Sequence, residues 1–456
     1  MFIEKIKSEG ISHLSYMIGS QGEAAVIDPR RDTKIYHELA RQNAVQIKYI
    51  FETHRNEDYV IGSCQLSKET NAHIFHGEAL DFEYGETTGE NDHYDIGQLR
   101  IRVLETPGHT FESLSYVLYD TSFSEEQAVG VFTGDTLFIG DVGRTDFYPE
   151  QKEKVAGLLY DSIFKKILPL GDAVLLYPAH GAGSVCGAGL ANREFSTLGY
   201  EKQHNPRLQM DRSSFIDFKV NEHHYQPPYF KKMEALNLSG AKILPPTQAP
   251  EVVTAEKLEN YTKDSEWQVI DIRSAEAFAG AHIPGALALP LSMVPAFGGW
   301  FLSYDKSLAV ICENPSHIET LNTYLQRMGY SQIKAFLGGG MSTWETRGLD
   351  FESTPGISVH TLKSWQKESR PHTLLDVRSQ NEYTSIHVPQ SQHVYLGHLP
   401  EQLETIPRHQ PVITFCGSGQ RALIAASLLQ RSGFEQVFVC LGSLKAWKQA
   451  GYATQK

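Results

Sequence analysis

The C-terminal half of this chain contains an internal repeat, and this repeat limits the possible folds more than any other feature. Three landmarks recur at an offset of 103 to 105 residues: Asp271 as Asp376, Cys312 as Cys416, and Trp344 as Trp447. A nearly constant offset over three landmarks predicts a duplicated module, divided near residues 353–356. In each copy the pattern runs strand, helix, strand, helix, which is typical of an α/β domain with a parallel sheet.

The N-terminal part follows a different pattern of short apolar runs that end in polar loops. Five such runs are expected to be strands: EAAVIDP (23–29), IKYIFETH (47–54), LRIRVLETPGH (99–109), AVGVFTGD (128–135) and AVLLYPAHG (173–181). The proline-rich segment 244–250 cannot support a helix or a central strand, so it marks a boundary. The expected domains are 1–240, 251–352 and 357–456, in line with the length of 456 residues.

The composition argues against several classes of partner. The chain has 41 Lys and Arg against 54 Asp and Glu, and no run rich in Lys and Arg, so we expect no nucleic-acid partner. No apolar stretch approaches the length that spans a bilayer, and charged residues interrupt the N-terminus, so we expect a cytoplasmic protein without a membrane partner. Five widely spaced cysteines without a C-x-x-C pair predict reduced thiols.

Candidate metal ligands lie where the apolar runs end: His54 in THRNEDY, His109 in TPGHT and Asp135 in TGDTLF. The first of these segments resembles the T-H-x-H-x-D-H run of the metallo-β-lactamase fold, whose further ligands come from a GH turn, a GD turn and a late PAHG. Two histidines of that run are Asn56 and Tyr59 in this chain. The resemblance therefore implies an αββα sandwich with a site for one metal.

The three remaining ligands suggest which metal the site takes. Two imidazoles and one carboxylate with open positions form the facial triad that suits non-heme Fe(II) and dioxygen, whereas paired metals suit hydrolysis. We therefore expect one Fe(II) bound by His54, His109 and Asp135. Asp58 and His180 remain from the usual second site, and we expect them to orient ligands through hydrogen bonds.

The two repeated modules resemble rhodanese domains, which are sulfurtransferases that carry sulfur on a cysteine persulfide. The resemblance rests on D-I-R and the segment AHIPGA (281–286) in the first copy, and on D-V-R, Glu382-Tyr383 and the Cys416 loop in the second. The loop CGSGQR (416–421) lies between an apolar run and a helical pattern, so backbone N–H groups favour a thiolate or persulfide there. It matches C-x-x-G-x-R, which implies Cys416 as sulfur carrier and Arg421 as its catalytic partner, with a cradle of Gly417, Ser418, Gly419 and Gln420.

The corresponding loop of the first copy, CENPSH (312–317), departs from the rhodanese pattern. Pro315 stands where the second copy has Gly419, which removes one N–H donor, and Glu313 adds a negative charge beside Cys312. We expect this copy to be a degenerate module with an architectural role. The expected fold class is thus α/β and α+β multidomain, with an αββα sandwich followed by two rhodanese-like α/β domains.

The order of the domains resembles the persulfide dioxygenase–sulfurtransferase fusions of bacteria. This resemblance implies oxidation of a low-molecular-weight persulfide, such as that of glutathione, coenzyme A or bacillithiol, by Fe(II) and O2 to sulfite and thiol. It also implies that Cys416 transfers sulfane sulfur to sulfite and forms thiosulfate, which detoxifies sulfide and persulfide. A homo-oligomer, as a dimer or tetramer, is expected from the same resemblance.

Further residues are candidates for contact with substrate or sulfur. Arg144, in a segment similar to G-R-T-D-F of persulfide dioxygenases, either contacts substrate or pairs with an acid to brace its loop. Tyr177 is a second candidate, and Arg207, in Asn205-Pro206-Arg207, is a third whose role is otherwise structural. Cys186, six residues after His180, is either an auxiliary thiol or a packing residue.

Two other functions remain open at this point. The first is hydrolysis of glutathione thioesters in the manner of glyoxalase II, although that reaction normally needs the two-metal ligand set. The second is non-enzymatic, with the rhodanese copies as modules that bind partners or sense sulfur. The intact loop from Cys416 to Arg421 argues against the second alternative.

Overall fold

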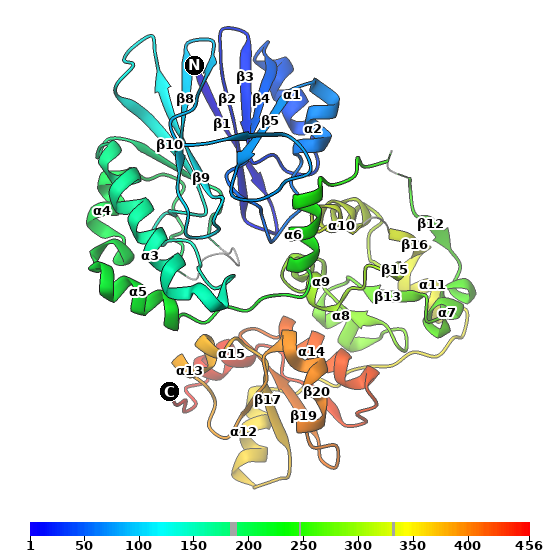
Figure 1. Ribbon diagram of the computed structural model, residues 1–456. Helices are drawn as coiled ribbons and strands as arrows, with labels where there is room; N and C mark the ends of the chain where they lie inside the picture. Colours follow the sequence, from blue (N-terminus) through cyan, green and yellow to red (C-terminus); the bar gives the residue numbers. More distant parts are fainter. Residues whose placement is uncertain (183–188, 246–247, 331–332) are drawn as a thin grey trace. The chain divides into compact units, whose positions relative to one another are not determined.

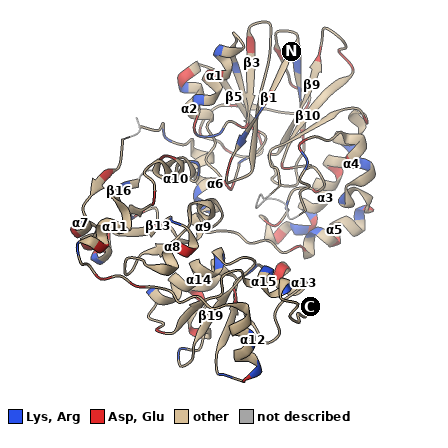
Figure 2. Ribbon diagram, turned by 180° about the vertical axis from the view of Figure 1, so that it is seen from behind, with Lys and Arg blue, Asp and Glu red and all other residues tan. Residues whose placement is uncertain are grey.

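The computed structural model describes residues 1–182, 189–245, 248–330 and 333–456 (Figure 1). The chain forms two compact units, one of residues 1–247 with 326–329 and the other of residues 248–325 with 330–456. The second unit contains both rhodanese-like modules. Lys and Arg are interspersed with Asp and Glu along the helices of both units (Figure 2). Among the described residues, no helix combines the length and apolarity needed to cross a membrane.

Two β-sheets lie at the centre of the N-terminal unit. The first has the order β1-β2-β3-β4-β5-β6, and the second has the order β11-β10-β9-β8-β7. The strands of the first sheet are β1 (Phe2–Ser8), β2 (His13–Ser20), β3 (Glu23–Ile27), β4 (Gln46–Phe51), β5 (His73–Gly77) and β6 (Glu86–Thr88). Those of the second are β7 (His93–Ile96), β8 (Leu99–Glu105), β9 (Leu114–Asp120), β10 (Ala128–Gly134) and β11 (Leu175–Pro178).

Helices cover the outer face of each sheet in this unit (Figure 1). Helices are needed there because apolar side chains point to both faces of β3. Ala25 and Ile27 pack between the sheets, whereas Ala24 and Val26 pack on the outer face. The helices are α1 (Lys34–Gln42) and α2 (Ser63–Thr70) on the first sheet, then α3 (Lys152–Ser162), α4 (Leu198–His204), α5 (Arg212–Asn221) and α6 (Phe230–Ser239). Short turns of 3-10 or π-helix occupy Pro149–Gln151, Ile163–Ile167, Leu168–Leu170 and Pro206–Gln209. The predicted αββα sandwich is confirmed.

Each module of the second unit is built on a parallel sheet. The orders are β12-β16-β15-β13-β14 and β18-β17-β19-β20. The first sheet has β12 (Glu251–Val253), β13 (Trp267–Asp271), β14 (Leu287–Ala288), β15 (Ser307–Ile311) and β16 (Ile333–Leu337). The second has β17 (Thr373–Asp376), β18 (Gln392–His393), β19 (Val412–Phe415) and β20 (Val437–Val439).

Helices surround both of these sheets. The first module has α7 (Ala255–Lys263), α8 (Ala275–Gly280), α9 (Val294–Phe301), α10 (Ser316–Arg327) and α11 (Gly340–Thr346), and a 3-10 turn at Leu291–Met293. The second has α12 (Val359–Lys367), α13 (Gln380–Ser385), α14 (Gln420–Arg431) and α15 (Ser443–Gln449), and 3-10 turns at Leu396–Glu401 and Leu403–Thr405. The expected pair of rhodanese-like α/β domains is confirmed.

The two modules share equivalent hydrogen bonds, in agreement with the internal repeat of the sequence. Arg273 binds the carboxylate of Asp271 with Nη2 at 2.6 Å, and Arg378 binds Asp376 in the same way at 2.6 Å. The Trp344 indole donates to the Asp350 carbonyl at 2.8 Å, and the Trp447 indole donates to the Ala453 carbonyl at 2.9 Å. The arginine of each D-x-R motif therefore braces the loop that follows the strand.

Candidate metal centre and cysteine loop

The structure brings His54, His109 and Asp135 together from three strand ends. His54 follows β4, His109 follows β8, and Asp135 comes directly after β10. The carboxylate Oδ2 of Asp135 lies 3.6 Å from Nε2 of His109 and 3.9 Å from Nε2 of His54. One ligand atom from each residue lies within 4.8 Å of the other two, and all three residues are buried.

Hydrogen bonds fix the orientation of both imidazoles. The Thr53 hydroxyl donates to Asp28 Oδ2 at 2.7 Å, so it accepts from Nδ1 of His54 at 2.9 Å. Nδ1 of His109 donates to the Arg144 carbonyl at 2.9 Å. Each ring thus uses Nδ1 for the protein and keeps Nε2 for the common centre, which is how metal-binding histidines are usually held.

The inward-facing atoms fit a bound cation. His54 Nε2, His109 Nε2 and Asp135 Oδ2 are buried and have no hydrogen-bond partner among the described residues. Unpaired buried polar atoms are costly, and a metal ion satisfies all three at once. Burial lowers the pKa of His54 to about 4, so this imidazole stays neutral and keeps its lone pair. The donor set is therefore suited to one divalent metal ion.

Asp58 and His180 form a hydrogen-bonded chain that ends on Asp135. His180 donates from Nδ1 to Asp135 Oδ1 at 2.7 Å and from Nε2 to Asp58 Oδ2 at 3.0 Å. Burial alone would lower the pKa of His180, but the two carboxylates outweigh it and raise that pKa well above its usual value. His180 therefore links Asp135 to Asp58 through both of its ring nitrogens.

Glycines precede two of the candidate ligands, His109 and Asp135, at positions where a neighbouring segment approaches the backbone closely. Gly108, at φ +148°, lies where an added Cβ would come within 2.4 Å of the Leu159 backbone in α3. Gly134, at φ +53°, lies where a Cβ would come within 2.6 Å of the Thr53 side chain. Both positions favour glycine because of their backbone conformation and because the neighbouring chain leaves no room.

Arg144 and Arg207 are both engaged with acids of their own unit. The buried Arg144 guanidinium binds Asp146 with two hydrogen bonds of 2.6 Å and lies 4.9 Å from the centre of the Phe147 ring. Arg207 donates to Asp141 at 3.0 Å and packs on the Phe218 ring at 3.9 Å. Contact of either arginine with substrate stays a prediction.

Tyr177 and His180 line a cavity of about 460 Å³ in the same unit. Tyr177 stacks on Phe132 with ring centres 4.9 Å apart, and Lys5, Lys7 and Arg193 lie around the cavity. A tyrosine and cations at one cavity are compatible with an anionic organic ligand. Cys186, the candidate auxiliary thiol, lies outside the described residues.

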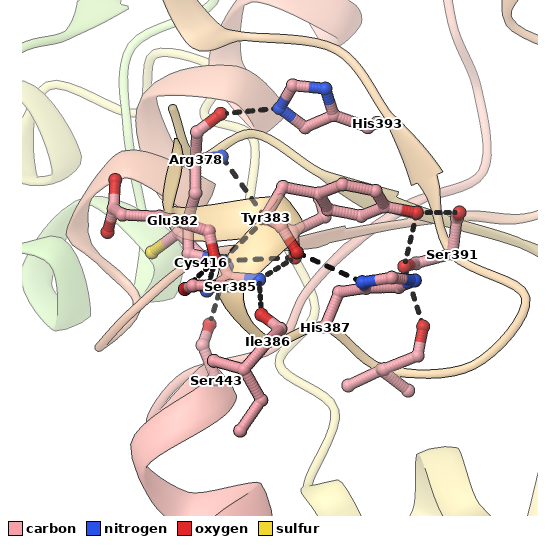
Figure 3. Close-up of polar contacts among 12 residues, drawn as sticks. Arg378, Glu382, Tyr383, Ser385, Ile386, His387, Ser391, His393, Cys416 and Ser443 are labelled. Atoms are coloured by element: carbon pink, nitrogen blue, oxygen red, sulfur yellow. Dashed lines mark hydrogen bonds and ion pairs between the residues drawn. The ribbon is translucent and has the colours of Figure 1, made fainter. Parts of the chain in front are cut away.

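The Cys416 loop connects β19 to α14. Cys416 is 1% exposed, and its backbone N–H donates to the Ser443 hydroxyl at 3.1 Å (Figure 3). Its Sγ accepts from the Gly419 N–H at 3.1 Å. Gly419 has φ +118°, a conformation that turns its N–H toward the sulfur and suits glycine. The loop between Cys416 and Gln420 therefore surrounds the sulfur with backbone at the start of a helix.

Arg421 lies beside this loop and forms an ion pair with Glu382. Its Nη1 and Nη2 bind the two oxygens of Glu382 at 2.6 and 2.8 Å. Burial would raise the pKa of Glu382, but Arg421 and Ser379 outweigh burial and hold that pKa at about 2. A Cβ built on Gly417 would lie 3.2 Å from Arg421 Nη2, so the guanidinium extends over the loop.

A second cavity, of about 530 Å³, opens next to the cysteine loop. It is lined by Gly417, Leu444, Lys445, Lys448 and Gln449. The backbone N–H groups of Leu444 and Lys445 donate to the carbonyls of Cys416 and Gly417 at 3.1 and 3.0 Å. The first turn of α15 thus supports the loop, and the same helix presents two exposed lysines at the cavity.

The equivalent loop of the first module is organised differently. Pro315 occupies the position of Gly419, so the N–H that reaches Sγ in the second module is missing. The N–H groups of Ser316 and His317 bind Asn314 at 3.0 Å each. Burial and the neighbouring Asp271 raise the pKa of Cys312 to about 11, which favours its thiol form.

Three side chains at these centres have roles that were not predicted from the sequence. Glu57 is 2% exposed, and its Oε2 lies 3.4 Å from His109 Nε2. Ser443 binds the Cys416 backbone, and Glu382 pairs with Arg421. The spacing Ser379-x-x-Glu382 is a capping-box pattern that would have placed Glu382 at a helix start, but its partner 39 residues away left no local signal.

Comparisons with protein families match all three domains. The metallo-beta-lactamase superfamily matches residues 9–180, and the rhodanese-like domain family matches residues 254–347 and 358–450. A crystal structure of a metallo-beta-lactamase from Staphylococcus aureus subsp. aureus COL is 31% identical, with a TM-score of 0.67. That similarity covers 74% of this chain and 98% of the other, so it extends beyond the N-terminal domain.

Two relatives match the N-terminal part of the chain. The mitochondrial persulfide dioxygenase ETHE1 of Mus musculus is 29% identical over 219 residues, which covers 45% of this chain and 76% of the relative. The hydroxyacylglutathione hydrolase of Dictyostelium discoideum is 27% identical over 236 residues, which covers 45% of this chain and 85% of the relative. Relatives of similar distance thus carry out two different reactions.

Proposed function

Because the chain belongs to the metallo-β-lactamase superfamily and carries two rhodanese-like domains after that domain, we propose that it is a persulfide dioxygenase and sulfurtransferase. The observation that carries this proposal is the one-metal donor set of His54, His109 and Asp135, beside which Asp58 and His180 are bound to each other. Fe(II) held by that set would supply the redox chemistry that O2 requires.

The proposed first reaction oxidises the outer sulfur of a low-molecular-weight persulfide. A persulfide R–SSH, O2 and water give R–SH, sulfite and two protons, so the S–S bond breaks and the outer sulfur gains three oxygens. In this step Thr53 and the Arg144 carbonyl keep the two imidazoles oriented, and His180 holds Asp135. The carriers to compare are glutathione, coenzyme A and bacillithiol.

The proposed second reaction takes place at Cys416. Its thiolate attacks the outer sulfur of another persulfide, takes up that sulfur as Cys416–SS⁻, and releases the carrier as thiol. Sulfite then attacks the terminal sulfur, which forms thiosulfate and restores the Cys416 thiolate. The Gly419 N–H stabilises negative charge on sulfur, and the guanidinium of Arg421, which is paired with Glu382, lies beside the loop.

The cavity beside the Cys416 loop supports the proposal that the sulfur acceptor is an anion. Arg421 is already neutralised by Glu382, so sulfite needs other cations on its path to Cys416. Lys445 and Lys448 provide them at the cavity that Gly417 lines. We propose that these two lysines attract sulfite or thiosulfate.

The alternative is hydrolysis of glutathione thioesters, and the similarity to a hydroxyacylglutathione hydrolase favours it. A two-metal hydrolase would need ligands for the second metal, and Tyr59 and Asn56 replace histidines of the family's run. Tyr59 packs on His13 with ring centres 4.0 Å apart, and Asn56 donates to the His54 carbonyl at 3.2 Å. Both side chains are engaged in packing or backbone support, which argues against this alternative.

The test is oxygen uptake by anaerobically iron-loaded protein with glutathione persulfide, with sulfite and thiosulfate measured in the same reaction. Uptake that is lost in His109→Ala, and thiosulfate that is lost in Cys416→Ser while uptake continues, are the expected results. Coenzyme A and bacillithiol persulfides serve as parallel substrates. Cleavage of a glutathione thioester without oxygen uptake from any of the three would establish the hydrolase instead.

A further inference from the structure

Ser443 occupies a backbone conformation that normally favours glycine. It is the first residue of α15, is 0% exposed and has φ +41°, in the left-handed region that serine rarely adopts. At the offset of 103 that relates Trp344 to Trp447, the equivalent residue of the first module is Gly340, at φ +59°. Because a side chain in this conformation strains the backbone, its presence at Ser443 points to a role for the hydroxyl.

The Ser443 hydroxyl lies between backbone groups of two neighbouring strands. The strands β19 and β20 are parallel, and the Cys440 N–H donates to the Thr414 carbonyl at 3.0 Å. The next bond of a parallel ladder would join the Cys416 N–H to the Cys440 carbonyl. Instead, the Cys416 N–H donates to the Ser443 hydroxyl at 3.1 Å (Figure 3). The same hydroxyl donates to the Cys440 carbonyl at 2.6 Å, so it separates Cys416 from β20.

This separation lets the Cys416 backbone leave the sheet and enter the loop. There its Sγ accepts from the Gly419 N–H at 3.1 Å, and its carbonyl accepts from the Leu444 N–H at 3.1 Å. We propose that Ser443 is a positioning residue for sulfur transfer, whose hydroxyl keeps Cys416 in the conformation in which the Gly419 N–H reaches the sulfur. The inference rests on Cys416 as the sulfur carrier of the proposed function.

The first module has neither of these two features at the equivalent positions. Gly340 carries no hydroxyl, and a Cβ built on it would lie 3.0 Å from the Cys312 carbonyl oxygen, which leaves little room for a side chain. Pro315 has no N–H to offer the sulfur of Cys312. The hydroxyl and the N–H that reaches the sulfur thus occur together in the second module and are both missing from the matching positions of the first.

The test compares Ser443→Gly with Ser369→Gly in the full chain. Ser369 is the matched control, because it is also a serine in the left-handed region, at φ +52°, but is exposed just after α12. Glycine relieves the same backbone strain in both variants, and in Ser443→Gly the Cys416 N–H can bond directly to the Cys440 carbonyl. We therefore expect neither variant to lower the urea midpoint, followed by tryptophan fluorescence.

Activity is expected to distinguish the two variants. Thiosulfate formation from glutathione persulfide and sulfite is measured without O2. In Ser443→Gly the kcat is expected to fall by about tenfold or more, because the bond to Cys440 draws Cys416 away from the Gly419 N–H, while the KM for sulfite stays within about twofold. Ser369→Gly is expected to keep both values within about twofold of the wild type. An unchanged kcat in Ser443→Gly, or a fall of kcat together with a lower urea midpoint, would overturn the proposal.

A measurement of cysteine reactivity tests the role of Ser443 without sulfur transfer. The rate at which iodoacetamide alkylates Cys416 at pH 7, followed by mass spectrometry of its peptide, reports on the thiolate that the Gly419 N–H stabilises. We expect alkylation to be about tenfold slower in Ser443→Gly and unchanged in Ser369→Gly. If the wild type forms no thiosulfate, the proposed function fails, and the alkylation rate alone decides the role of Ser443. A rate in Ser443→Gly that equals or exceeds that of the wild type would then reject this role.

Discussion

Thr53 connects the first histidine of the metal centre to the neighbouring strand. Its hydroxyl and backbone N–H both bind Asp28, at the end of β3, and the same hydroxyl orients His54. Thr53 therefore links the imidazole of His54 to the end of β3, and this link to a rigid sheet limits the movement of the ring. Metal affinity commonly depends on such outer contacts by one to two orders of magnitude.

The lysines of α15 lead to a prediction about acceptor specificity. In Lys445→Glu/Lys448→Glu, repulsion of anions at the cavity beside Gly417 is expected to raise the KM for sulfite, with glutathione persulfide as sulfur donor, by about tenfold. The kcat is expected to change little, because the loop around Cys416 is untouched. Lys367→Glu, an exposed lysine of α12, is the control for net charge. An equal rise in KM in the control would contradict a local role for the pair.

Glu382 leads to a prediction about pH. Its pKa is about 2 in the folded protein against an ordinary value of 4.5, so its stabilising effect is present above pH 4.5 and is lost as the pH falls toward 2. Glu382→Gln is therefore expected to lower the urea midpoint at pH 7, with a gap to the wild type that narrows below pH 4.5. Tryptophan fluorescence is the measurement, since all five tryptophans lie at or beyond residue 267.

Glu401→Gln is the matched control for the pH experiment, because Glu401 is exposed and belongs to the same module. Its urea midpoint is expected to follow the wild type at every pH. A gap between Glu382→Gln and the wild type that stays constant from pH 7 to pH 3 would show that the pair with Arg421 does not govern the acid response.

At the scale of elements, the ends of strands organise both centres. The loops after β4, β8 and β10 bring three ligands together, and the loop after β19 carries Cys416. One element differs from the sequence pattern: the apolar run 59–64 looks helical, but α2 begins only at Ser63, and Ile61 forms a β-bridge with Arg30. A Cβ on Gly62 would come within 2.1 Å of the Arg30 carbonyl, so this contact between distant segments overrides the local pattern.

The packing of α3 against the loop of His109 leads to a prediction about stability. In Gly108→Ala the new methyl group meets the Leu159 backbone, and we expect a loss of about 1–3 kcal/mol in the stability of the N-terminal unit. Differential scanning calorimetry is the measurement, because the tryptophans report only on the rest of the chain. Gly89→Ala, whose methyl group would meet only the Glu105 side chain, should leave this transition nearly unchanged.

At the scale of the whole molecule, one chain carries a metal centre and two copies of a sulfur-transfer fold. Under the proposed function, covalent linkage would raise the effective concentration of sulfite near Cys416. Within the second unit the two modules are packed together: the Trp300 ring covers Gly397 so closely that a Cβ there would come within 2.6 Å. The first module thus supports the second structurally.

Cys312 leads to a prediction about which of the two modules transfers sulfur. Cys312→Ser is expected to leave thiosulfate formation within twofold of the wild type, because Pro315 removes the N–H that a persulfide would use and burial raises the pKa of the thiol. Product analysis with glutathione persulfide and sulfite is the measurement. Loss of thiosulfate in Cys312→Ser, with an unchanged tryptophan spectrum, would make the first module catalytic.

The sequence by itself determined the identity of the parts. The residue types at His54, His109 and Asp135, the loop of Cys416 and the duplicated module follow from motifs and periodicities within short segments. The αββα sandwich follows from the resemblance of those motifs to a known fold. Such patterns are local, so they can be recognised in the sequence without a structure. Pro315 and Glu313, which predict a degenerate first cysteine loop, are likewise local features.

Only the tertiary structure decided how these parts meet. The approach of Glu57 to His109, the pairing of Arg421 with Glu382 and the bracing of Arg144 by Asp146 depend on side-chain directions that no spacing reveals. The role of Ser443 depends on a contact with the Cys416 backbone across 27 residues. Such contacts are products of packing between elements, which is why the motifs identified the reactive groups but not the partners that orient and balance them.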